Sequence, residues 1–102
     1  MTDGIITIMD ERDVPITTNV TLLSSSWDSI ALTQNVTVVG ILEDATKQIV
    51  NVSPVGSSMI AAANSVIYCS GQAEDTLIFT CLEIPTEDVV YNVSIQGAMY
   101  MG

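Results

Sequence analysis

The chain has 102 residues, enough for one domain with its own core, and it combines 48% hydrophobic residues with only 14% charged ones. Twelve acids against two basic residues, Arg12 and Lys47, give a net charge of −10, so no basic patch can form and neither nucleic acid nor an anionic membrane is expected as a partner. The small share of charged side chains favours a sandwich with a large interior, or an outer surface buried against other subunits.

The first fifteen residues are predicted to form an arm ahead of the domain. An apolar run at 4–9 precedes the charged group at 10–13 and Pro15, which interrupts sheet pairing. The start of the chain lacks a positive region and a long apolar run, so we expect no secretory signal and folding in a cytosol. The arm can close an edge of its own sheet or reach a neighbouring subunit, and we favour the neighbour.

Short runs with period-two patterning follow the arm, and turn residues bound each of them. Such runs are typical of half-buried strands. Residues 57–64 instead predict one short helix, because serines, an alanine run and a closing Asn resemble helix caps and a helix interior. The expected strands cover residues 16–25, 32–39, 48–53, 66–72, 76–82 and 89–95.

This pattern predicts an all-β fold, an immunoglobulin-like antiparallel β-sandwich of about six to seven strands with one short helical crossover. Trp27 precedes both cysteines, so the Cys-Trp-Cys order of true immunoglobulin domains is absent and the likeness is architectural. The predicted organisation is an N-terminal arm at 1–15, a β-sandwich domain at 16–96 and a C-terminal tail at 97–102.

Trp27 and the two cysteines each have a structural and a functional interpretation. We expect the single Trp to fill one end of the core, and the alternative is a stacking surface for a sugar. Cys69 and Cys81 lie on the two arms of a predicted hairpin. We expect a reduced, buried pair, and the alternative is a cross-strand disulfide.

Two recurring polar patterns are assigned to the strands and loops. Asn19, Asn35, Asn51 and Asn92 each begin an Asn-Val-Thr or Asn-Val-Ser triplet, formally a glycosylation sequon. We interpret the triplets as strand alternation, with Asn outward and Val inward. The acids occur in small groups where loops are expected, so we interpret them as solvated loop charge, with calcium ligation as the alternative.

The residue types that carry catalysis are scarce. The chain has no histidine, so it can form neither a Ser-His nor a Cys-His pair, and two cysteines are too few for a structural zinc site. No glycine-rich phosphate loop occurs. We therefore expect a protein that is not an enzyme and that has no cofactor.

Several short motifs follow one another along the chain. They are Ser24-Ser25-Ser26-Trp27, Thr-Gln-Asn-Val-Thr-Val-Val-Gly at 33–40, Val52-Ser53-Pro54, Cys69-Ser70-Gly71-Gln72, Thr-Leu-Ile-Phe-Thr at 76–80, Ile84-Pro85-Thr86 and the run at 89–95. Their order resembles a small β-sandwich domain of virion structural proteins from tailed phages of Gram-positive bacteria, of the head-fibre, decoration or tail-fibre type. The likeness covers roughly residues 17 to 96 and transfers no functional residue. The arm and the Met-rich tail lie outside it.

The resemblance implies a virion component that folds in the host cytoplasm and then assembles on the particle. We expect a surface domain of the head, a head fibre or capsid decoration, that forms a homo-oligomer, for which a trimer is one arrangement, and contacts other capsid or tail proteins. The alternative is a tail or baseplate adhesion module that binds a host-surface carbohydrate or protein through Trp27, Tyr68, Tyr91 or Tyr100. The expected assembly contacts are Ile5, Ile6, Ile8, Met9, Met99, Tyr100 and Met101.

Overall fold

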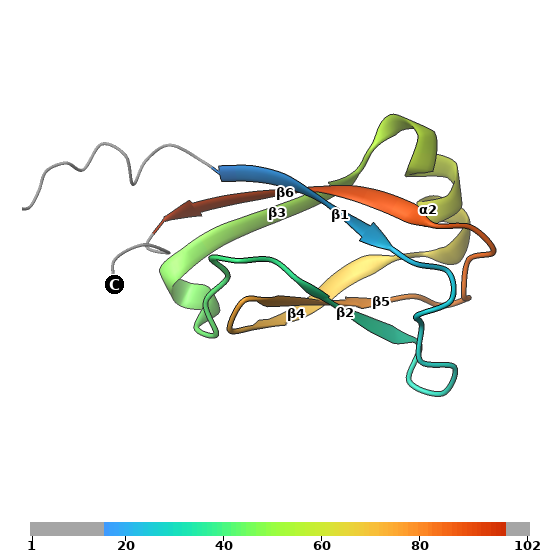
Figure 1. Ribbon diagram of the computed structural model, residues 1–102, viewed down its shortest axis with the longest axis horizontal. Helices are drawn as coiled ribbons and strands as arrows, with labels where there is room; N and C mark the ends of the chain where they lie inside the picture. The colour runs from blue at the N-terminus through green and yellow to red at the C-terminus, as the bar shows by residue number, and fades with distance from the viewer. Residues whose placement is uncertain (1–15, 98–102) are drawn as a thin grey trace, which may run out of the picture.

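The computed structural model describes residues 16–97, which are mostly strand with one short α-helix. Two antiparallel sheets of three strands each account for the strands of this part of the chain, in the orders β1-β6-β3 and β2-β5-β4 (Figure 1). The strands are β1 (Ile16–Leu22), β2 (Thr33–Thr37), β3 (Gln48–Pro54), β4 (Tyr68–Ala73), β5 (Thr76–Thr80) and β6 (Val89–Gly97). Two 3-10 turns, η1 (Ala45–Lys47) and η2 (Gly56–Ser58), and the helix α2 (Met59–Ser65) complete the order.

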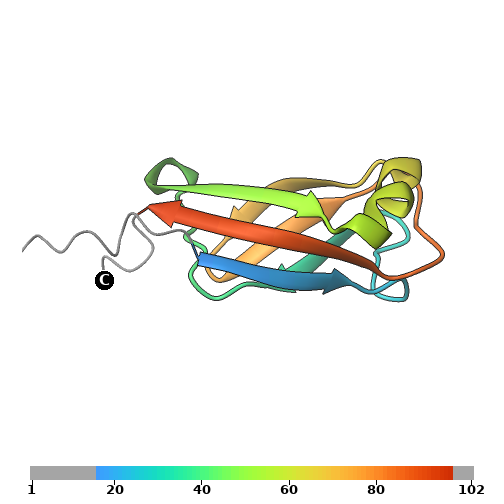
Figure 2. The same cartoon turned by 90° about the horizontal axis from the view of Figure 1, so that it is seen from above.

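The two sheets lie one above the other, and their facing sides form the core (Figure 1). Alternate residues of the central strand β6 point inward, so Val89, Val93 and Ile95 are fully buried against Leu77 and Phe79 of β5. Seen from above, β1 lies along one long edge of the molecule and β3 along the other (Figure 2). Strands β1 and β2 therefore border one edge, and β3 and β4 border the opposite edge.

The immunoglobulin-like part of the prediction is not confirmed, although the mostly β character is. A constant immunoglobulin domain has the strand orders ABED and CFG, in which the first two strands are neighbours. Here β1 pairs with β6, the last strand, and β4 and β5 are the only consecutive strands that pair within residues 16–97.

The helix forms where the sequence predicts it and its N-cap residue is a serine, as expected, but the cap bond and the C-terminal end differ from the prediction. Ser58 is the N-cap residue, yet its hydroxyl accepts the N–H of Val90, at 2.9 Å, and makes no cap bond. At the other end Val66, not Asn64, adopts the left-handed conformation (φ 52°, ψ 63°). The N–H of Ile67 then donates to the carbonyl of Ala62, which is the Schellman arrangement usually made by glycine.

Glutamine side chains, two of them buried, hold the two sheets together at both edges. Gln34 of β2 is 6% exposed, and its amide makes two bonds to the backbone of Leu23, accepting its N–H and donating to its carbonyl, each at 3.0 Å. At the opposite edge Gln48 of β3 accepts the N–H of Leu42, and Gln72 of β4 donates to the Leu42 carbonyl. A side-chain amide thus substitutes for a neighbouring strand, since it offers a donor and an acceptor together.

Several loop acids also have a specific structural role, which refines the interpretation of these residues as solvated charge. Asp28 accepts the N–H groups of Ile30 and Ala31, and these backbone bonds, that from Ala31 foremost, lower the pKa of its carboxyl group. Asp75 accepts the N–H of Gly40, and Asp88 that of Ser24. These carboxylates therefore fix the loops that join the two sheets.

Candidate binding groove between strands β3 and β4

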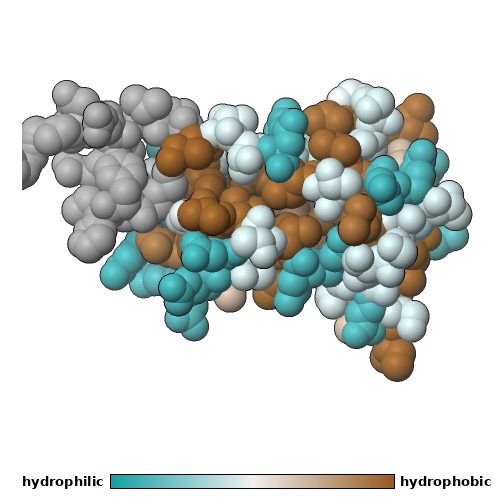
Figure 3. All heavy atoms as spheres, viewed as in Figure 1, coloured by the Kyte–Doolittle hydropathy of each residue, from teal (hydrophilic) through white to brown (hydrophobic). Residues whose placement is uncertain are grey.

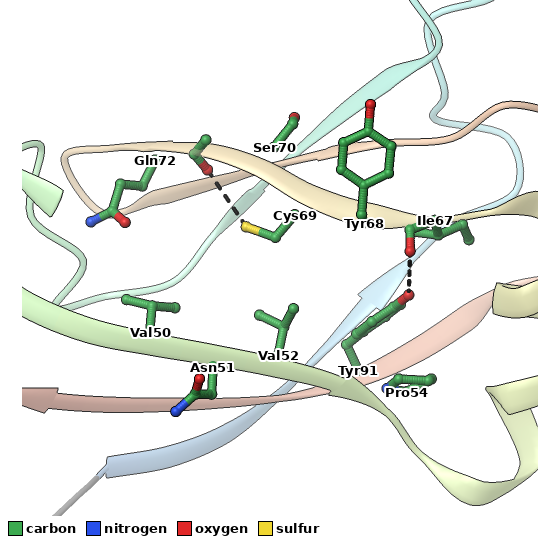
Figure 4. Close-up of a pocket in the computed structure, with 11 residues that line it drawn as sticks. Val50, Asn51, Val52, Pro54, Ile67, Tyr68, Cys69, Ser70, Gln72 and Tyr91 are labelled. Carbon is green, nitrogen blue, oxygen red and sulfur yellow. Dashed lines mark hydrogen bonds between the residues drawn. The ribbon is translucent and has the colours of Figure 1, made fainter.

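A groove of about 490 Å³ opens along the edge bordered by β3 and β4 (Figure 4). Its walls come from the outermost strand of each sheet, and its base from the aromatic ring of Tyr91 on β6. The lining residues are Val50, Asn51, Val52, Pro54, Ile67, Tyr68, Cys69, Ser70, Gly71, Gln72 and Tyr91.

Strand alternation decides which of these side chains enter the groove. Val50 and Val52 point from β3 toward Cys69 of β4, whereas Asn51 lies on the other face of β3 (Figure 4). On β4, Tyr68 and Ser70 point away from the groove (Figure 4). Val50, Val52 and Cys69 are half-buried, so each leaves part of its apolar surface open to the groove.

The base of the groove is rigid because its polar groups are paired. The hydroxyl of Tyr91 donates to the carbonyl of Ile67 at 3.3 Å, which connects the two sheets. The same ring packs against Phe79 with a centroid distance of 5.1 Å and a tilt of 52°. The thiol of Cys69 donates to the carbonyl of Gly71 at 3.6 Å.

The groove carries no charge: none of its eleven lining residues is acidic or basic. Burial raises the pKa of the Cys69 thiol, which therefore stays protonated near neutral pH and is a weak nucleophile. Burial also raises the pKa of Tyr91, and the neighbouring Cys69 adds to this effect. The groove thus offers apolar surface and neutral hydrogen-bonding groups, which suit a polypeptide better than a charged ligand.

Strand β3 also presents backbone groups to this groove that have no strand partner among residues 16–97. The N–H of Val55 donates to the carbonyl of Val90, and alternate residues of an antiparallel strand bond to the same partner. Val50 and Val52 are an odd number of residues from Val55, so they are not in this bonded set. Their N–H and C=O groups therefore face away from β6, toward the free edge. On β4 a register shift between Cys69 and Gly71 disturbs the edge, which makes β3 the more regular surface for a new strand.

The edge strands lack the charged residues that usually prevent such pairing. None of the six strands within residues 16–97 contains an Asp, Glu, Lys or Arg. Natural sheets protect their edges with charges, prolines or bulges. Strand β3 has only Pro54, at its end, so within residues 16–97 nothing protects most of its free edge.

The opposite edge has a smaller groove, of about 360 Å³, between β1 and β2. It is lined by residues of both strands, including Val20, Val36 and Gln34. Apolar side chains are visible along this edge between the two sheets (Figure 3). The amide of Gln34 bonds across one end of this groove, and at the β3–β4 edge Gln72 of β4 likewise donates to Gln48 of β3, at 3.2 Å.

The structure decides between most of the alternatives left open by the sequence. Trp27 is 8% exposed and belongs to the core, as predicted, and its indole N–H has no acceptor among residues 16–97. The two cysteines are free, and Cys69 lies opposite Phe79, not opposite Cys81. In the sequon triplets the asparagines are exposed, while Val93 is buried and Val20, Val36 and Val52 pack against the core.

The expected assembly contacts all fall outside the described residues 16–97. They are Ile5, Ile6, Ile8 and Met9 in the arm, with Met99, Tyr100 and Met101 in the tail. The groove itself was not predicted. The sequence does contain a signal for it, because none of the expected strands includes a charged residue. We interpreted the low charge content only for the chain as a whole, not strand by strand.

No protein-family model, curated protein or solved structure matches the chain. Within residues 16–97, no three His, Cys, Asp or Glu side chains gather closely enough to hold a metal ion. The same part of the chain includes no helix of the length and apolar character needed to cross a membrane. The function is therefore inferred from the groove, the sheet edges and the composition.

Proposed function

We propose that the chain is a non-enzymatic structural protein of a bacteriophage virion, a surface domain of the head that works as a homo-oligomer. The observation that carries this proposal is the uncharged, unprotected edge of β3 beside an apolar groove. Such an edge is a template for pairing with another chain. The ordered motifs between Ser24 and Ile95 add the resemblance to head-fibre and decoration domains.

In this proposal the fold is an antiparallel β-sandwich that serves as a rigid building block. The sheets supply the core, and the loops, which hold the acids of residues 16–97, keep the assembled surface soluble. The protein folds in the host cytoplasm and joins the virion afterwards. Its partners are copies of itself, with a trimer as one arrangement, and other capsid or tail proteins.

Exposed apolar side chains support the presence of subunit contacts. Ile49 on β3 is 58% exposed and Ile60 on α2 is 76% exposed. Val39, Ile30 and Leu82 are also well exposed, at 80%, 92% and 66%. Single exposed apolar residues are common on protein surfaces. Here they occur together with a low charge content and open sheet edges, and contact with other subunits would account for these three features.

The alternative function, adhesion of a tail or baseplate to a host-surface carbohydrate or protein, requires an aromatic side chain that is exposed inside a groove. Trp27 and Tyr91 are 8% and 3% exposed, so neither can stack on a sugar. Tyr68 is 48% exposed, but its ring points away from the groove (Figure 4). Tyr100 lies outside the described residues. We therefore favour assembly over adhesion.

The proposal is tested by locating the chain on particles purified from lysates of the source strain. An antibody raised against residues 16–97 and detected with gold should label particle heads in electron micrographs, and pre-immune serum should not. Label on tails would support the adhesion alternative. Purified particles without label, together with a strictly monomeric chain in light scattering over a concentration series, would refute the proposal.

A further inference from the structure

We propose that residues 4–9 of one copy of the chain occupy the β3–β4 groove of a second copy as an added strand. This inference rests on the proposed function, because it names the segment that would join the subunits of the homo-oligomer. It joins two features that are otherwise unexplained. One is an apolar arm ahead of the domain, and the other is an open edge without protecting charges.

The groove sets two requirements for its occupant. The N–H and C=O groups of Val50 and Val52 face the free edge, so the occupant must supply a backbone in extended conformation. The half-buried side chains of Val50, Val52 and Cys69 require apolar cover. A short uncharged strand meets both requirements at once, by the mode known as β-augmentation.

The segment at 4–9 has the composition that these requirements demand. Its sequence, Gly-Ile-Ile-Thr-Ile-Met, contains no charge and no proline, and it is rich in β-branched residues that favour strands. In an extended conformation Ile6 and Ile8 share one face, and Ile5, Thr7 and Met9 share the other. Either face presents two large apolar side chains to the valines of β3.

The arm also joins the domain close to the groove. Ile16 and Val50 both pair with Ile95 of β6, so they lie two strand spacings apart, about 10 Å. Residues 10–15 can span roughly 20 Å when extended, so a short linker suffices. The same length allows the arm to reach the groove of its own domain, and the choice between the two needs a further observation.

Exposed apolar residues beside the groove favour a second copy. Ile49 lies on the outer face of β3, and Met59 and Ile60 lie on α2, on the β3 side of the molecule (Figure 2). Their exposed fractions are 58%, 56% and 76%. A strand added in the groove by the chain's own arm would leave these side chains in water. A second copy that delivers its arm brings a whole domain to the same edge and can cover them.

The native thiol of Cys69 provides the test, because it points into the groove (Figure 4). Five variants of the full chain would each carry one new cysteine, at Ile5, Ile6, Thr7, Ile8 or Met9. Mild oxidation with diamide, which removes two electrons and two protons from a thiol pair, should form a covalent dimer on a non-reducing gel. We expect the dimer yield to alternate, several-fold higher at positions of one face than at those of the other.

A matched control replaces the groove thiol in each variant by Cys69→Ser, with the buried Cys81 left in place. The dimer should disappear in these double variants, whereas dimers linked through two arm cysteines would persist and would count against the proposal. A cross-link within one chain would show that the arm fills its own groove, which overturns the assignment to a second copy. Failure of all five positions to react with Cys69 would overturn it as well.

Light scattering on the same unoxidised samples separates this inference from the proposed function. A stable oligomer without cross-linking to Cys69 would remove the arm from the groove but leave a homo-oligomeric structural protein. A monomer at all concentrations, with no cross-link between chains, would contradict both.

Discussion

Replacing Gln34 by glutamate would test whether a side-chain amide holds the two sheets together at the β1–β2 edge. The amide accepts the N–H of Leu23 and donates to its carbonyl, each at 3.0 Å, and the side chain is 6% exposed. A glutamate of the same shape keeps the first bond. When ionised it cannot make the second, because it has no hydrogen to donate.

The expected cost at pH 7 follows from this geometry. The variant loses one hydrogen bond and leaves the Leu23 carbonyl facing a carboxylate oxygen, at a buried site. Such losses cost about 1–3 kcal/mol for the unpaired group, and the buried charge raises the total to roughly 3–5 kcal/mol of unfolding free energy. A protonated glutamate donates to the carbonyl and restores both bonds, so we expect its pKa in the folded state to be raised.

The sign of the pH dependence is then fixed. The pKa of the glutamate introduced at position 34 is raised on folding. The stability contributed by the protonated side chain is therefore fully present below the unfolded pKa of about 4.3 and is lost as pH rises through the folded pKa. Between pH 7 and pH 5 the deficit relative to wild type should shrink by about 1–3 kcal/mol, at about 1.4 kcal/mol per pH unit. Urea unfolding of wild type, Gln34→Glu and Gln34→Leu at both pH values measures this.

Gln34→Leu is the matched control, since it removes both hydrogen bonds but cannot titrate. Its deficit relative to wild type should be the same at pH 7 and pH 5. If the deficit of Gln34→Glu were equally independent of pH, the carboxyl group would not face the Leu23 carbonyl, and the assigned bridge from β2 to the residue after β1 would be wrong.

Two further outcomes follow from the structure. Gly97→Ala should lower the free energy of unfolding by about 2 kcal/mol in urea titrations. The reason is that Gly97 has φ +120° and that a Cβ at this position would lie 3.0 Å from the Cα of Gln48. An unchanged unfolding midpoint would contradict this conformation. At pH 8, iodoacetamide should label Cys69 before Cys81, because Cys81 is only 1% exposed. Both should react more slowly than a free cysteine, because burial raises the pKa of each thiol. Equal labelling rates of the two cysteines in mass spectrometry would count against their placement.

Local patterns predicted the elements well because the signals for them are local. The Asn-Val-Thr triplets placed Val20 and Val36 on the inner face, since side chains alternate along any strand, whatever its partner. The helix followed from serine and alanine between two strand-like runs. Its left-handed end at Val66 was not predictable, because a β-branched residue adopts positive φ only when the surrounding packing forces it.

The order of the strands could not be predicted, because it depends on contacts between distant segments. Nothing in residues 16–22 shows that their partner is the last strand, since period two specifies a face but not a neighbour. The bridges made by Gln34 and Gln48 were missed for a related reason. A glutamine in a strand-like run looks like a solvent-facing residue until its acceptor and donor, far along the chain, are known.

The pairing of β1 with β6 sets the order of events during synthesis. Ile16 pairs with Ile95, so the first strand of the described domain emerges from the ribosome long before its partner exists. At about 5–20 residues per second, the delay is roughly 4–16 s for this separation of 79 residues. During that time an uncharged strand has no partner, and on a polysome the nearest candidate is the same strand of the next nascent chain. Slow translation of this domain would therefore favour misassembly, and chaperone binding to residues 16–22 would oppose it.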